Sequence, residues 1–128
     1  MATREIPREE WPSFFETFSR LHEGWRVTVE ALATDIGDQV EAEGLPLAEI
    51  TAEKEPDGRE VLSLILGAPG EPASVTKIVD NPRRVFLLQT DEGMDSALEI
   101  EADDDTRLLL KLQEAMAPER LDGVVAKR

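Results

Sequence analysis

The stretch SFFETFSRLHEGWRVTVEALA, residues 13–33, contains the change of hydrophobic period that separates a helix from a sheet. Before Gly24 the apolar residues follow the 3.6-residue period of an amphipathic helix and form one stripe: Trp11, Phe14, Phe15, Phe18 and Leu21. After Gly24 they alternate with polar residues, as in a strand with one buried face: Trp25, Val27, Val29, Ala31 and Ala33. The sequence therefore predicts a helix that ends near Gly24 and a strand that starts directly after it.

The start of this helix is predicted from the residues around Pro12. Proline has no backbone N–H, so it fits the first turn of a helix, where that group would have no partner. The regular helix should begin near residues 9–11, and Arg8–Glu10 should form a preceding turn. Gly24 suits the position just after a helix, because glycine adopts the left-handed conformation without strain.

Two hairpins are predicted farther along the chain, each with a defined register. Pro56-Asp57-Gly58 matches a three-residue loop closed by glycine. Centring this loop on Asp57 gives four pairs: Glu55–Arg59, Lys54–Glu60, Ala52–Leu62 and Ile50–Leu64. Centring the second turn on Asp104 gives three more: Glu101–Arg107, Ile100–Leu108 and Leu98–Leu110. Both registers place apolar side chains opposite apolar ones, and a one-residue slip would destroy that match.

Further strands are expected around residues 39–43, in PASVTKIV (72–79) and in RRVFLLQT (83–90), with the register of the last two left open. The sum is an α+β fold. An N-terminal amphipathic helix packs on a strongly curled antiparallel sheet or open barrel of seven to eight strands, mostly a meander. Residues 1–112 are expected to form this single domain, and residues 113–128 a loosely ordered C-terminal tail.

The composition argues against several classes of partner. The 128 residues include 28 acidic and 14 basic side chains, for a net charge of -14. Such a chain repels nucleic-acid phosphates and anionic lipids, so neither nucleic acid nor membrane is expected as a partner. Without cysteine there are no disulfides or thiol nucleophiles. The first residues, MATREIPREEW, lack the apolar run of a secretory signal, which favours a cytoplasmic location.

His22 is the single histidine and the first residue to consider for chemistry near neutral pH. It falls in the last turn of the predicted helix, where a cation complements the helix dipole and bonds the last carbonyls. Ser19 lies one turn earlier, but a Ser–His pair at this spacing is not a known catalytic arrangement. A capping or packing role is therefore predicted for His22, and no catalytic residue is assigned.

Two acidic segments, TDEGMDS (90–96) and ADDDTR (102–107), raise the question of cation binding. Calcium loops use oxygens from alternate positions, with a central glycine and a closing glutamate, and DDDT lacks this pattern. Aspartates also form turns by accepting bonds from nearby backbone N–H groups, which is the better explanation of the run. LGAPGEP (66–72) has no phosphate-binding or dinucleotide-binding glycine pattern. No metal-ligating or cofactor-binding residue is therefore assigned.

Three segments resemble a family of small uncharacterised bacterial proteins, classed only as a domain of unknown function. They are REIPREEWPSFFETFSRLHEGWRVTVEAL (4–32), LPLAEI (45–50) and ALEIEADDDTRLLLKL (97–112). In that family an Ile-Pro pair precedes a helix with Trp and Phe, and a His-x-Gly-Trp-like junction leads into a β-rich remainder. The resemblance covers roughly residues 3–112 and leaves 113–128 outside it. It implies a free-standing single domain and carries no activity that could be transferred.

Three functional hypotheses follow. The leading one is a non-enzymatic binding or protein-interaction module, with a homodimer through a sheet edge or the helix as one form of interaction. Trp11 and Trp25 could anchor an interface, but their places on apolar faces favour a core role. The second is a small-ligand carrier or weak enzyme that uses the barrel interior, which requires a cavity of about 300 Å³ or more. The third is cation binding at the acidic loops.

Overall fold

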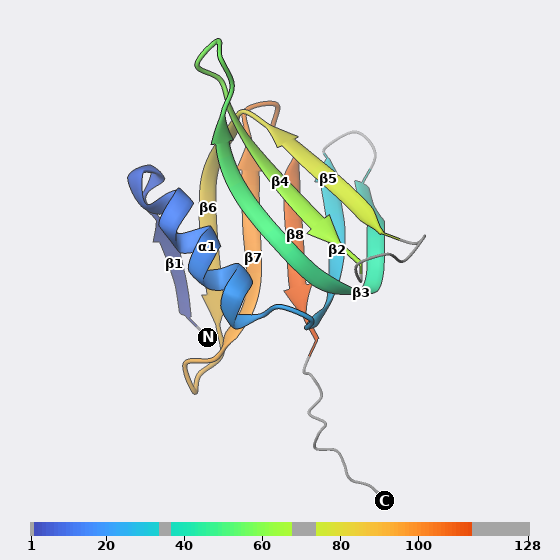
Figure 1. Cartoon of the computed structure of the whole chain (residues 1–128). Coiled ribbons are helices and arrows are strands. Elements are labelled where there is room, and N and C mark those ends of the chain that lie inside the picture. The colour runs from blue at the N-terminus through green and yellow to red at the C-terminus, as the bar shows by residue number, and fades with distance from the viewer. Residues whose placement is uncertain (1, 34–36, 68–73, 114–128) are drawn as a thin grey trace, which may run out of the picture.

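The computed structural model describes residues 2–33, 37–67 and 74–113 (Figure 1). The elements in chain order are β1 (Ala2–Ile6), η1 (Arg8–Glu10), α1 (Trp11–Leu21), β2 (Arg26–Ala33), β3 (Gly37–Lys54), β4 (Glu60–Leu66), β5 (Val75–Asp80), β6 (Pro82–Gln89), β7 (Asp95–Ala102) and β8 (Arg107–Leu112). The strands form one antiparallel sheet in the order β1-β6-β7-β8-β2-β3-β4-β5. An antiparallel sheet with one N-terminal helix is thus confirmed, and the sheet is open, with β1 and β5 at its ends.

The helix begins where Pro12 predicts. A 3-10 turn over Arg8–Glu10 leads into α1, and Pro12 occupies the first turn. The buried face differs from the predicted stripe at its end, because Leu21 is 65% exposed and His22 is 5% exposed. His22 follows Phe18 by four residues and so stays on the same side of the helix, while Leu21 is displaced toward solvent.

Both predicted hairpin registers are confirmed. In the first, the strand pairs are Lys54–Glu60, Ala52–Leu62 and Ile50–Leu64. The N–H of Glu55 donates to the carbonyl of Arg59 over 2.7 Å, and Gly58 has a φ of +90°. In the second, the pairs are Glu101–Arg107, Ile100–Leu108 and Leu98–Leu110. Turn chemistry and apolar matching therefore suffice to fix these local pairings.

The strand expected around residues 39–43 is part of a much longer one. β3 has 18 residues, pairs first with β2 and then leaves it to pair with β4. Gly44, with a φ of +71°, is the extra residue of a bulge between the pairs Thr28–Glu43 and Val27–Leu45, and the pairing with β2 ends at Pro46. Beyond it, the N–H of Leu47 donates to the carbonyl of Trp25 over 2.7 Å, which holds β3 to the junction after the helix. After this change of partner, the second half of β3 pairs with β4 and no longer with β2.

Two features of the strand order were not predicted. β1 (Ala2–Ile6) was not expected as a strand, yet it pairs with β6 from Ala2–Gln89 to Ile6–Val85. β5 and β6 are consecutive in the chain but are not paired, because β5 pairs with β4 and β6 pairs with β1 and β7. Asn81, with a φ of +51°, forms the corner between them. Consecutive strands therefore fail to pair at two points, between β1 and β2 and between β5 and β6.

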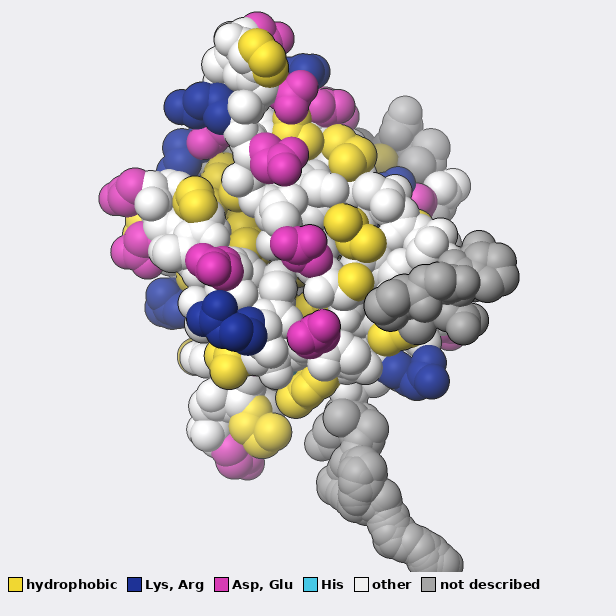
Figure 2. Space-filling view, viewed as in Figure 1, with side chains coloured by type: hydrophobic (Ala, Val, Ile, Leu, Met, Phe, Trp, Pro, Cys, Tyr) yellow, Lys and Arg dark blue, Asp and Glu magenta, His cyan; other side chains and the backbone are white. Residues whose placement is uncertain are grey.

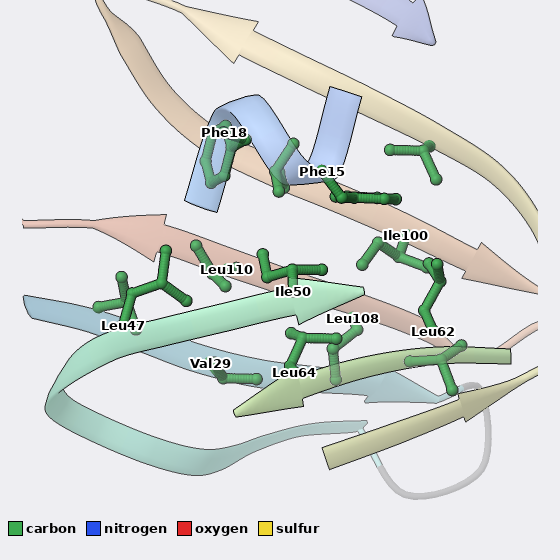
Figure 3. Packing of buried hydrophobic residues seen from close by; sticks show 14 of the residues in the cluster. Phe15, Phe18, Val29, Leu47, Ile50, Leu62, Leu64, Ile100, Leu108 and Leu110 are labelled. Atoms are coloured by element: carbon green, nitrogen blue, oxygen red, sulfur yellow. The ribbon is translucent and has the colours of Figure 1, made fainter. Parts of the chain in front are cut away.

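The core lies between the helix and the two halves of the sheet. Figure 3 shows side chains from α1, β3, β4, β7 and β8 directed into one shared interior. Phe15, Leu64 and Leu110 are each 0% exposed, and Ile50 is 1% exposed. Over the described ranges, these large apolar side chains occupy much of the interior. A hollow beside β5 that Ile100 and Leu108 help to line measures about 240 Å³, below the roughly 300 Å³ that the carrier hypothesis requires.

The C-terminal tail expected at 113–128 lies outside the described residues except for Gln113. The N–H of Gln113 donates to the carbonyl of Arg26 over 2.9 Å, so the sheet bonds continue one residue past β8. No helix within the described ranges combines the length and apolar character needed to cross a membrane.

Candidate binding groove between the helix and strand β3

His22 lies at the end of α1, as predicted, with both ring nitrogens facing acceptors. Its Nδ1 lies 2.8 Å from the carbonyl oxygen of Phe18, which can only accept a hydrogen bond. Its Nε2 lies 3.4 Å from Oδ2 of Asp95, at the start of β7. The ring also packs between Phe18 and Trp25, with centroids 4.3 and 4.8 Å away. A buried ring with both nitrogens engaged caps the helix and has no nitrogen left for a substrate.

Ser19 belongs to a different contact. Its hydroxyl accepts a bond from the N–H of Ile50 at 2.8 Å and lies 3.3 Å from the carbonyl oxygen of the same residue. This side chain is buried, and its hydroxyl bonds the main chain of Ile50 where a neighbouring strand would otherwise do so. The structure therefore assigns Ser19 to the seam between α1 and β3 rather than to a pair with His22.

Ser19→Ala should lower the free energy of unfolding by about 1–3 kcal/mol, because the buried main chain of Ile50 would lose its partner. Ser13→Ala is the matched control, since its hydroxyl is exposed and donates to the carbonyl of Glu10 over 3.2 Å. That control should stay within about 0.5 kcal/mol of the parent. Urea denaturation followed by tryptophan fluorescence measures both, and equal effects of the two variants would contradict the role of the seam.

The edge of β3 remains open beyond this seam. Because Glu55 bonds Arg59 across the hairpin, the main chain of every second residue back from Glu55 is bonded to β4. The main chains of Ile50, Ala52 and Lys54 therefore point the other way, toward the helix. Ser19 takes the place at Ile50. Among the described residues, neither Ala52 nor Lys54 has a backbone partner on that side.

A groove runs along this open edge. A hollow of about 400 Å³ lies between the start of the helix and β3–β4, and its lining includes Arg8, Trp11, Pro12, Ala52 and Lys54. A second hollow of about 290 Å³ continues along α1. Pro12 and Ala52 line both, so the two hollows adjoin, and we call them together the helix–strand groove. Figure 1 shows α1 beside the second half of β3, where the groove lies.

Arg8 closes one end of the groove. Its guanidinium lies 4.5 Å from the ring centroid of Trp11 and forms an ion pair with Glu60. The same group lies 3.3 Å from the carbonyl oxygens of Pro82 and Arg83. Arg8 thus joins the turn before the helix to β4 and β6, and it holds that wall in place.

The groove is acidic. Its lining contains five carboxylates and two cationic side chains: Glu9, Glu16, Glu49, Glu53, Glu60, Arg8 and Lys54. One of the two cations, Arg8, is already paired with Glu60. Figure 2 shows acidic side chains over the helix and over the strands and hairpin beside it. The groove therefore has the charge to attract a cationic ligand.

The acidic loops behave as turns. In the Asp104 turn, the N–H of Thr106 donates to Oδ1 of Asp104 over 3.0 Å. This backbone bond, followed by the Thr106 hydroxyl, lowers the pKa of Asp104. In the other segment, Asp95 faces His22 and also accepts a bond from Gln89 at 2.9 Å. Within residues 2–33, 37–67 and 74–113, no group of three or more acidic or histidine side chains is placed to hold a metal ion.

Two important side chains were missed from the sequence. Asp95 was considered only as part of an acidic segment, and nothing local links it to His22. Arg8 was considered only as part of a turn, although its position three residues before Trp11 brings the two side chains onto one side of a helical turn. Trp11 is buried and Trp25 is half-buried, so both contribute to packing around the helix.

Comparison with known proteins shows similarity to uncharacterised sequences. The model of a family of unknown function, DUF5335, matches residues 2–121. The match extends beyond residue 112, where the resemblance was expected to end. An uncharacterised protein of Aquifex aeolicus (strain VF5) is 25% identical over 116 residues, which cover 91% of this chain and 96% of that protein. No solved structure matches the chain.

Proposed function

We propose a function for this chain, which belongs to the DUF5335 family of unknown function, from its own geometry. It is a non-enzymatic binding module, and its helix–strand groove takes an extended basic peptide from a protein partner. As part of the same proposal, the sheet is strongly curled and the protein works in the cytoplasm, as the sequence predicts. The groove lies where β3 leaves β2 and passes beside the helix.

The observation that carries this proposal is the open edge of β3 inside the groove. Ala52 and Lys54 offer two N–H donors and two carbonyl acceptors to a neighbouring chain. An extended peptide satisfies such an edge by adding as a further strand, with affinity from main-chain bonds and specificity from alternate side chains. Ser19 already makes this kind of contact at Ile50, so the peptide would continue a row of bonds that the helix begins.

Side chains around the edge define the expected sequence of the peptide. Successive residues of an added strand point alternately into the hollow and out of it. The inner positions meet Trp11 and Pro12, which suits a small apolar residue. The outer positions pass Glu49 and Glu53, which suits lysine or arginine. An alternating basic and apolar peptide therefore fits better than a uniformly charged one.

The other two hypotheses have less support. An interior carrier site competes for space with the core, where Leu62, Leu64 and Leu98 are each 0% exposed. A hollow of sufficient size exists, but it lies at the surface beside β3. For cation binding, the acidic segments supply turns and a partner for His22, and the part of the chain that the structure describes has no converging set of three or more acidic side chains.

The test is fluorescence anisotropy with the labelled peptide Lys-Val-Lys-Val-Lys. It should bind at least about tenfold more tightly than Glu-Val-Glu-Val-Glu, and raising the salt should weaken binding because the charges are exposed. The same lysine peptide with methylated backbone nitrogens is the control for main-chain pairing, and it should lose most of the affinity. Equal binding of the three peptides, or binding of none, would contradict the proposal.

A further inference from the structure

We propose a second interaction surface, independent of the groove: the free edge of β5 pairs with β5 of a second copy of this chain. Among the described strands, β5 (Val75–Asp80) is the last of the sheet and pairs with β4 alone. The proposed contact is an antiparallel strand pair across a two-fold axis, which continues the sheet from one copy into the other.

The backbone bonds define which groups of β5 face outward. The N–H of Asn81 donates to the carbonyl of Glu60 over 3.0 Å, just beyond the end of the β4–β5 ladder. By the alternation of antiparallel pairing, Val79 and Lys77 are then bonded to β4. The main chains of Thr76, Ile78 and Asp80 therefore face away from β4 and form the free edge.

The side chains on this edge favour pairing, in contrast to those at the other end of the sheet. Ile78 is 50% exposed, one of four large hydrophobic side chains exposed among the described residues. Lys77, whose charge would otherwise protect the edge, is held by Glu41 at 2.6 Å. β1 carries exposed Arg4 and Glu5, which discourage self-pairing there.

The register of the strand pair follows from which residues face outward and from their charges. Every second residue of β5 faces outward, and each of these must lie opposite an outward-facing residue of the other copy. The two-fold axis therefore passes through a residue of the strand and not between two residues. An axis at Lys77 would oppose two like charges, and an axis at Val79 would set Ile78 against the partner's Asp80. An axis at Ile78 sets isoleucine against isoleucine, and Thr76 against the partner's Asp80. The strand is thus self-complementary in one central register.

The size of the contact indicates a weak dimer. β5 has six residues, and pairing two such strands buries far less than the roughly 1,200 Å² of a stable interface. The self-association should therefore be reversible and dependent on concentration. Because β5 and the groove involve different strands, loss of one interaction leaves the other measurable.

Sedimentation velocity from about 10 µM to about 1 mM tests the proposal, since weak contacts dissociate in this range. The parent chain should show a rising weight-average mass. Thr76→Pro removes an outward N–H without breaking a bond to β4, and Ile78→Lys opposes two charges at the axis. Each variant should weaken self-association at least about tenfold.

Leu21→Lys is the matched control, because Leu21 is 65% exposed on the helix and should leave the dimer unchanged. Circular dichroism confirms that each variant is folded. A parent chain that stays monomeric up to about 1 mM would overturn the proposal. So would a dimer that neither Thr76→Pro nor Ile78→Lys weakens, which would place the contact elsewhere.

Discussion

Phe15→Ala is expected to lower the free energy of unfolding by about 3–5 kcal/mol, the range for removing a buried aromatic ring. Phe15 is 0% exposed and lies where α1 meets the interior of the sheet (Figure 3). Its ring also makes an edge contact with Phe14, with centroids 5.3 Å apart. Loss of the ring leaves a cavity at the point that attaches the helix to β3.

Glu16→Ala is the control for this prediction, because its side chain is exposed on the same helix turn. It should change the free energy of unfolding by no more than about 0.5 kcal/mol. Urea denaturation monitored by circular dichroism gives both values. A loss below about 1 kcal/mol for Phe15→Ala would mean that the helix is not packed on the sheet as described.

Ala52→Pro should reduce the affinity for Lys-Val-Lys-Val-Lys at least about tenfold and keep the fold. Proline removes the N–H that points into the groove, and this N–H has no bond to β4. Anisotropy measures the affinity, and urea denaturation measures the stability.

Thr51→Pro is the informative comparison. Thr51 pairs with Ser63, and its main chain faces β4, so proline there removes a bond of the sheet. That variant should lose several times more stability than Ala52→Pro. If Ala52→Pro binds the peptide like the parent, the peptide does not pair with this edge.

Local features of the fold could be predicted from the sequence. The loops around Asp57 and Asp104 fix two hairpin registers, because turn geometry and apolar matching act over a few residues. The change of period at Gly24 locates the end of the helix. Each of these depends on neighbours in the chain.

Non-local features could not be predicted. The pairing of β1 with β6 joins segments separated by about eighty residues, and the alternation in the sequence says nothing about which strands are neighbours. The sequence predicts only a short strand around residues 39–43, whereas β3 continues past Gly44 and Pro46 and changes partner, which depends on the position of β4.

In the candidate site too, local features could be predicted from the sequence and long-range contacts could not. His22 was placed at the helix end from its position before Gly24, but its contact with Asp95 depends on the packing of β7 beside the helix. The groove exists because Ser19 meets Ile50 and the edge beyond remains open, which no spacing in the sequence reveals.

Backbone amide NMR of the full chain with Lys-Val-Lys-Val-Lys tests the central claim most directly. The amides of Ala52 and Lys54 face the groove, so in the free protein they should exchange with solvent faster than those of Thr51 and Glu53, which face β4. Added peptide should shift the signals of Ala52 and Lys54 most and slow their exchange. Unchanged signals for these two amides, with the largest shifts elsewhere in the chain, would contradict strand addition to β3.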